Sequence, residues 1–468
     1  MAVVHFYFLP CRAVLGTGYD TGNIGNSREI GEYLKLFFRK TAYRKSSLFL
    51  GILLFLSISL PVHFLITLPM ESSISIENGT YRISDFYYLI LVAKSFWLGE
   101  TNSIYTLESN LRAMSSFFGQ EIKYAMPIGV SPTALLIWLP FSYVAIYSLS
   151  LANTAWVSFS LTVFSMAIII ARRTLYSLNP YFSNMFLFVT SLFFLSFAFQ
   201  ACIYMGNMSV LASGIFILLI LTLYSQRNTN PTLNFLLLLF YLIILSIKTT
   251  YLVIALILLL IFGYILEFIL SSGIIIFLFI LIDIFLGTGL IREWFDALSY
   301  YFLESMPEYY ASSFNMTTFV TFRSAFSMYL GHLPTMILSQ LFLFAGCVGI
   351  LFISATRHII PFRSIGQRIF PAKVNEPFLS VFLFSIILLF LPYIVGSEDL
   401  LIIVCFFIVL LYSSKQNFQK HFLYISSICA ILLLNHNAMP LPKPIWLFWA
   451  IKTALFINLL LILKNRRT

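Results

Sequence analysis

Long apolar runs follow one another along the chain, separated by short polar breaks. Most runs approach the ~20 apolar residues that an α-helix needs to cross a bilayer. The pattern predicts an all-α, polytopic integral membrane protein. Thirteen runs can be marked, at residues 48–69, 132–150, 153–171, 182–203, 208–224, 233–247, 249–269, 273–290, 333–354, 377–394, 399–412, 421–435 and 445–463.

Composition agrees with this pattern, since 60% of the residues are apolar and only 10% are charged. Soluble domains are about half apolar and a quarter charged. The net charge of +10 lies mainly in basic residues at the ends of apolar runs. That placement is typical of residues that orient spans in a membrane, and we expect no nucleic-acid partner. The five cysteines are scattered without CxxC spacing, so no disulfide framework or metal site is predicted.

Lysine and arginine in short loops indicate which loops are cytoplasmic. The stretch before residue 48 is basic, as are the loop at 357–373 and the C-terminus. Counting crossings from these segments places the two longest loops, 70–131 and 291–332, on the non-cytoplasmic side. These two loops hold much of the acid of the chain, so they are where we expect chemistry.

Thirteen crossings cannot leave both termini in the cytoplasm. Run 132–150 contains Pro132 and Pro140 and is the best candidate to dip into the membrane and return, although the weakly separated runs 233–247 and 249–269 offer another explanation. About 12 transmembrane helices are therefore expected. The predicted organisation is a cytoplasmic basic tail at 1–47, a catalytic membrane module at 48–290 that includes external loop 70–131, an external loop at 291–332, and C-terminal transmembrane helices at 333–468.

The segment after the first run is the most informative. Apolar residues recur in it at helical spacing, which predicts an interfacial helix in the first external loop with Asp85 near its N-terminal end. Asp85 would then face an aqueous space at headgroup depth. The alternative is that Asp85 only caps the helix. The residues that set the spacing are Phe86, Ile90, Ala93 and Trp97.

Several short motifs follow in a recognisable order. They are Asp85-Phe86-Tyr87-Tyr88 with Gly99 and Tyr105, the prolines 127, 132 and 140, Gly206-Asn207-Met208-Ser209, Lys248-Thr249, and Glu398-Asp399-Leu400-Leu401. In order and spacing, over residues 48–412, the chain resembles the membrane glycosyltransferases of the GT-C fold. It is most similar to the polyprenol-phosphate-mannose-dependent mannosyltransferases of glycosyltransferase family 87. Asn207 stands where that family usually has Gln, and Thr249 where it has Pro.

The resemblance implies a glycosyltransferase (a hexosyltransferase) that moves a sugar from a polyprenyl phosphate to a hydroxyl of an acceptor. Such a reaction needs a carboxylate to take the acceptor proton and cations or donors to hold the phosphate. Asp85 is the predicted catalytic base. Lys248 is the predicted phosphate contact, although a lysine between two apolar runs can also be an anchor that reaches the interface.

Other candidates complete the predicted site. Arg323 and His332 flank the return of the second external loop and are predicted to bind the donor phosphate, with interfacial anchoring as the alternative. Asn207, Tyr88, Glu398 and Asp399 are predicted to bind substrate, and for the two acids a solvated loop is the alternative. Asp283 lies in an apolar run and has no assigned role.

No DxD, HExxH or Walker motif is present, so we predict no metal and no cofactor beyond the lipid-linked donor. The expected partners are a polyprenyl-phosphate sugar, a glycolipid or glycan acceptor, and membrane lipid. The expected location is a bacterial inner membrane, with the active site on the non-cytoplasmic side. A flippase or other transporter of lipid-linked oligosaccharides, and a surface-polysaccharide polymerase or ligase, are the alternatives.

Overall fold

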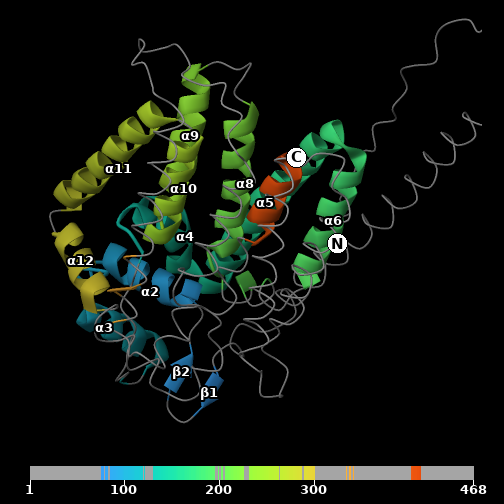
Figure 1. Cartoon of the computed structure of the whole chain (residues 1–468). Coiled ribbons are helices and arrows are strands. Elements are labelled where there is room, and N and C mark those ends of the chain that lie inside the picture. Colours follow the sequence, from blue (N-terminus) through green and yellow to red (C-terminus); the bar gives the residue numbers. More distant parts are fainter. Residues whose placement is uncertain are drawn as a thin grey trace, which may run out of the picture. The chain divides into compact units, whose positions relative to one another are not determined.

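The computed structural model describes residues 75–77, 80–82, 85–119, 121, 130–195, 199, 202–203, 206–225, 231–262, 264–286, 289–300 and 402–412, with isolated positions at 334, 337–338 and 341. This part of the chain is helical apart from one hairpin, in which β1 (Ser75–Glu77) pairs antiparallel with β2 (Thr80–Arg82) (Figure 1). The predicted tail at 1–47 and the predicted spans at 48–69, 377–394, 421–435 and 445–463 lie outside it, as does nearly all of 333–354.

The predicted apolar runs inside the described ranges form helices. In chain order, the helices are α2 (Asp85–Trp97), α3 (Leu107–Phe118), α4 (Thr133–Tyr147), α5 (Leu149–Leu178), α6 (Pro180–Leu195), α8 (Ser209–Ser225), α9 (Pro231–Leu245), α10 (Thr249–Ile261), α11 (Ile265–Leu286), α12 (Leu290–Tyr300) and α18 (Ile402–Tyr412). Two stretches among them are long and apolar enough to cross a membrane, namely α5 and Leu266–Leu286 of α11.

The break between the runs predicted at 249–269 and 273–290 is misplaced. Helix α11 continues through Ser271, and the break lies at Phe262–Tyr264 instead. There the Tyr264 N–H donates to the Leu259 carbonyl at 2.8 Å. This bond spans five residues, a pattern common where helices end.

Helix α4 is continuous across Pro140, so this proline does not divide the predicted run at 132–150. Its 15 residues span about 22 Å, which is less than the ~30 Å of a hydrocarbon core. The helix ends at Ser148, where the Ser148 hydroxyl accepts the Leu151 N–H at 3.2 Å and caps α5. The number of crossings stays a prediction.

Among the described helices, α5 and α8 make the most extensive contact with each other. Gly214 of α8 faces the backbone of Phe164 of α5, and a methyl group at Gly214 would lie only 2.8 Å from the Phe164 Cα. Small residues allow such backbone approach, which is how helices commonly pack in membranes. Helix α18 packs against α6, with 5.4 Å between the ring centroids of Phe186 and Phe407.

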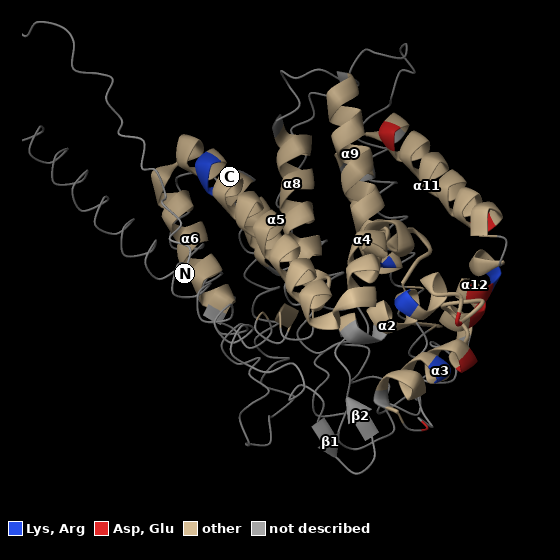
Figure 2. Ribbon diagram, turned by 180° about the vertical axis from the view of Figure 1, so that it is seen from behind, with Lys and Arg blue, Asp and Glu red and all other residues tan. Residues whose placement is uncertain are grey.

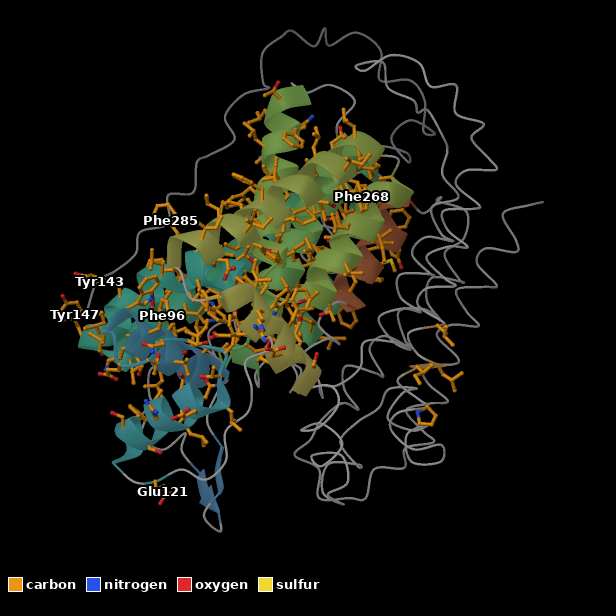
Figure 3. All side chains as sticks on the ribbon, turned by 90° about the vertical axis from the view of Figure 1, so that its left-hand side faces the viewer. Phe96, Glu121, Tyr143, Tyr147, Phe268 and Phe285 are labelled. Atoms are coloured by element: carbon orange, nitrogen blue, oxygen red, sulfur yellow. The ribbon has the colours of Figure 1, made fainter. Side chains whose placement is uncertain are left out.

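Apolar side chains also cover the outside of the long helices. On α11, Phe277, Ile284 and Phe285 are 61%, 72% and 85% exposed, and Phe285 stands clear of the ribbon in Figure 3. Such faces are costly in water but match a lipid environment. Among the described helices, those without any Lys, Arg, Asp or Glu are α4, α6, α8, α9, α10 and α18 (Figure 2).

The α5–α8 contact predicts opposite effects for two glycine substitutions. Gly214→Ala should lower the stability of the protein in nanodiscs by roughly 1–3 kcal/mol, because the added methyl group meets backbone that cannot move aside. Gly273→Ala on α11 is the matched control. Nothing lies within 4 Å of its new methyl group, so it should be neutral or stabilising by up to ~1 kcal/mol. Equal thermal unfolding temperatures for the two variants would contradict this packing.

Candidate functional site

Helix α2 begins at Asp85, as the sequence predicts. It packs on α4, α3 and α5, and Phe86, Ile90, Leu91 and Val92 are all buried. The helix is therefore more deeply embedded than an interfacial helix with one apolar stripe. Among the described elements of the first external loop, α3 has the stronger amphipathic pattern: Glu108 and Arg112 are exposed, and Ala113 and Met114 are buried.

The start of α2 touches the turn that carries the predicted Gly206-Asn207 motif. Gly206 has a φ of +61°, and a methyl group on it would lie 2.5 Å from the Phe86 Cβ and 3.1 Å from the Asn153 Oδ1. The Gly206 carbonyl accepts a hydrogen bond from the Trp156 Nε1 at 2.8 Å. Only glycine fits this backbone conformation and this spacing without strain. The residue next to Asp85 is thus held against the Gly206 turn.

The predicted residues Asn207 and Lys248 belong to one polar chain. The Asn207 Oδ1 accepts from the Ser209 N–H at 2.9 Å and from the Ser209 hydroxyl at 2.7 Å. The Ser209 Oγ lies 2.7 Å from the Tyr251 hydroxyl. The Lys248 Nζ lies 5.1 Å from the centroid of the Tyr251 ring, in cation–π geometry. A route of polar contacts therefore joins the start of α8 to the start of α10.

The entry to α4 joins the same region. The Ser131 N–H donates to the Ile247 carbonyl at 2.9 Å, and the Thr133 and Ser246 hydroxyls lie 2.6 Å apart. The Ser131 hydroxyl also donates to the Ser246 carbonyl. The proline-rich entry predicted from the sequence is thus tied to the residues just before Lys248.

The starts of four helices consequently meet. The start of α2 contacts the turn before α8, the start of α8 bonds to α10, and the start of α4 bonds to the segment before α10. Each helix N-terminus presents backbone N–H groups and a partial positive charge. Together with the Lys248 ammonium, this arrangement favours an anion. We call the region formed by Gly206, Asn207, Ser209, Lys248 and Tyr251 the N-terminal junction.

The remaining predicted site residues fall wholly or partly outside the described part of the chain. Arg323, His332, Glu398 and Asp399 lie outside the described residues, and so do the side chains of Asp85 and Tyr88. For Asp85 the structure gives the position of the backbone, at the first residue of α2 beside the Gly206 turn. The roles of all six residues stay predictions.

A second polar cluster was not singled out from the sequence. The Ser103 hydroxyl donates to the Glu293 carboxylate and accepts the Tyr105 N–H at 3.0 Å. This contact joins the two intervals that were expected to hold the chemistry. The only available signal was the pair of acids Glu293 and Asp296, and nothing in the sequence indicated a partner for Glu293 190 residues away.

Electrostatics distinguish this cluster from the rest of the described loops. Burial raises the pKa of Glu293, and the nearby Asp283 and Asp296 add to the increase, while the Ser103 hydrogen bond lowers it. Burial and the charge of Glu293 raise the pKa of Tyr105. Asp283, which had no predicted role, accepts the Ile291 N–H at 3.2 Å and so caps the first turn of α12.

No family model matches this chain, and no curated protein or solved structure shows significant similarity to it. Within the described ranges, no group of three or more His, Cys, Asp and Glu side chains is placed to hold a metal ion.

The contact between Gly206 and α2 predicts a selective loss of stability in Gly206→Ala. Gly99→Ala is the matched control. Gly99 also has a positive φ, of +73°, but nothing lies within 4 Å of the methyl group that the substitution adds. Both variants should suffer backbone strain, and Gly206→Ala should lose a further ~1–3 kcal/mol because its methyl group meets Phe86. Thermal unfolding in nanodiscs measures the difference. If Gly99→Ala were the less stable variant, α2 would not be held in the way described.

Proposed function

We propose that this protein is a membrane glycosyltransferase that moves a hexose, mannose in the first instance, from a polyprenyl phosphate to a glycolipid or envelope glycan. The observation that carries the proposal is the N-terminal junction. Three of the motifs that carry the resemblance to GT-C glycosyltransferases meet there, although they are far apart in the sequence. They are the motifs that begin at Asp85, at Gly206 and at Lys248. The full GT-C fold and about twelve crossings are part of the proposal.

The donor phosphate is the anion that we assign to the junction. Helix N-termini bind phosphate through free backbone N–H groups and the helix dipole. Lys248 adds a full charge, and its ammonium lies over the ring of Tyr251, whose hydroxyl lies 2.7 Å from the Ser209 Oγ. A lysine that served only as a span-end anchor would need none of these contacts.

Asp85 is the proposed base. It takes the proton of an acceptor hydroxyl while that oxygen attacks the anomeric carbon of the sugar. The bond from this carbon to the phosphate oxygen breaks, and the polyprenyl phosphate leaves with the electron pair. The junction stabilises the negative charge that develops on the phosphate. One displacement with one base inverts the anomeric carbon and needs no covalent intermediate.

The charges along α5 support catalysis on the non-cytoplasmic side of an inner membrane. Trp156, near the start of α5, bonds to the Gly206 turn, whereas Arg172 and Arg173 lie 16 residues further along, or about 24 Å. Basic residues are held on the cytoplasmic side. The junction then lies towards the opposite face.

A flippase is the competing proposal, and charge placement discriminates between the two. Transporters keep ionisable residues near the bilayer midplane. In the described helices the charges lie mainly on α2, α3 and α12 and near the ends of α5 and α11 (Figure 2), and α8, α9 and α10 have none. This distribution favours chemistry at one surface.

Asp85→Asn should abolish sugar transfer while the protein still inserts and folds. The loss of a general base predicts a fall of about 10²–10⁴ in kcat. The measurement is transfer from a panel of polyprenyl-phosphate sugars in nanodiscs. Glu108→Gln, which removes an exposed acid paired with Arg112 on α3, is the control and should keep full activity. Full activity of Asp85→Asn would remove Asp85 from the mechanism.

Lys248→Ala should weaken donor binding at least tenfold with a smaller change in kcat, because the lysine contacts the phosphate before and after transfer. Lys94→Ala is the matched control, since this half-buried lysine lies in the last turn of α2, far from its start. The KM for the polyprenyl-phosphate donor is the readout. An unchanged KM in Lys248→Ala would identify Lys248 as a membrane anchor.

A further inference from the structure

The cluster around Glu293 has the features of a second binding site, which shares no residue with the N-terminal junction. It is built from two segments, the connection between α2 and α3 and the first turns of α12. Ser103 and Tyr105 come from the first segment, and both are 2% exposed. Glu293 comes from the second and bonds to Ser103.

Tyr105 carries a polar atom that the described protein leaves unsatisfied. Its hydroxyl is buried and has no hydrogen-bond partner in the described part of the chain. Its position is tied to the cluster by the hydrogen bond from its backbone N–H to Ser103, and its phenol is close enough to feel the charge of Glu293. Thr101 and Trp294, in the same two segments, also have buried polar atoms without a partner there. Buried polar groups are almost always hydrogen-bonded, so unsatisfied ones grouped in this way point to a ligand.

The chemistry of the cluster defines the class of ligand. Glu293, Asp283 and Asp296 make the surroundings negative, which disfavours a phosphate. Arg292 and Asp296 form an exposed ion pair, with 4.0 Å between Nε and Oδ2, so Arg292 offsets Asp296 and not Glu293. A carboxylate, hydroxyls and an indole N–H are the groups that accept from and donate to the hydroxyls of a neutral sugar.

We propose that Ser103, Tyr105 and Glu293 form a subsite for a neutral sugar residue of the acceptor glycan. The identification of the ligand as the acceptor rests on the proposed transferase function. The subsite follows the C-terminal end of α2, and Asp85 stands at the other end. The two ends of this helix are 12 residues, or about 18 Å, apart. The acceptor is therefore longer than one sugar, with one residue held here and another at Asp85.

Direct binding tests the subsite without requiring transfer. The probes are neutral trisaccharides (mannotriose, maltotriose and cellotriose), and saturation-transfer NMR with the full chain in nanodiscs measures their Kd. At least one should bind the wild type. Tyr105→Phe removes only the unsatisfied hydroxyl and should weaken that binding about tenfold with no loss of thermal stability. Glu293→Gln keeps an oxygen for Ser103 and should also weaken binding, and the control Glu108→Gln should bind as the wild type does.

Two results would overturn the subsite: no trisaccharide binds the wild type, or both Tyr105→Phe and Glu293→Gln bind as tightly as the wild type. Trisaccharide binding that depends on Tyr105, in a protein that transfers no sugar, would leave the subsite standing and remove the transferase.

Discussion

The arrangement of the site depends on how closely the start of α2 approaches the Gly206 turn. Gly206 accepts the indole N–H of Trp156 through its carbonyl and leaves no room for a Cβ beside Phe86. Trp156 lies in α5, the longest of the described helices. Its ring stacks on that of Phe86, with 6.2 Å between the ring centroids. One turn without a side chain therefore fixes the helix that carries Asp85 against the helix pair α5–α8. The position of Asp85 relative to Asn207 follows from this contact.

The polar contacts of the N-terminal junction lie at the ends of helices whose interiors have no charge. This placement has a physical cause, because a charge inside an apolar span costs about 2.5–3.5 kcal/mol on insertion scales. Helix ends avoid that cost and offer backbone N–H groups at the same time. Lys248 and Asn207 therefore stand at breaks between helices, at the α9–α10 step and before α8. In a protein of this composition, such breaks are where phosphate chemistry is possible.

Within the described ranges, the hydrophobic runs in the sequence predicted helices, since the period and length of such runs follow from burial in an apolar environment. The break expected between the runs at 249–269 and 273–290 was misplaced, because α10 ends at Ile261 and α11 begins at Ile265. The motif order made Asn207 and Lys248 candidate site residues, but their link through Ser209 and Tyr251 depends on tertiary packing. The Ser103–Glu293 contact was also beyond prediction, because no local pattern encodes a pairing across 190 residues.

The central claim is that the N-terminal junction holds the phosphate of a lipid-linked donor. Photo-crosslinking with a polyprenyl phosphate that carries a diazirine on its first isoprene unit tests it directly, in nanodiscs, with labelled peptides located by mass spectrometry. The account predicts labels in the start of α2, in residues 203–209 and in residues 246–251, and their loss when unlabelled polyprenyl phosphate competes. Competed labelling confined to α6 or to the outer face of α11 would contradict it.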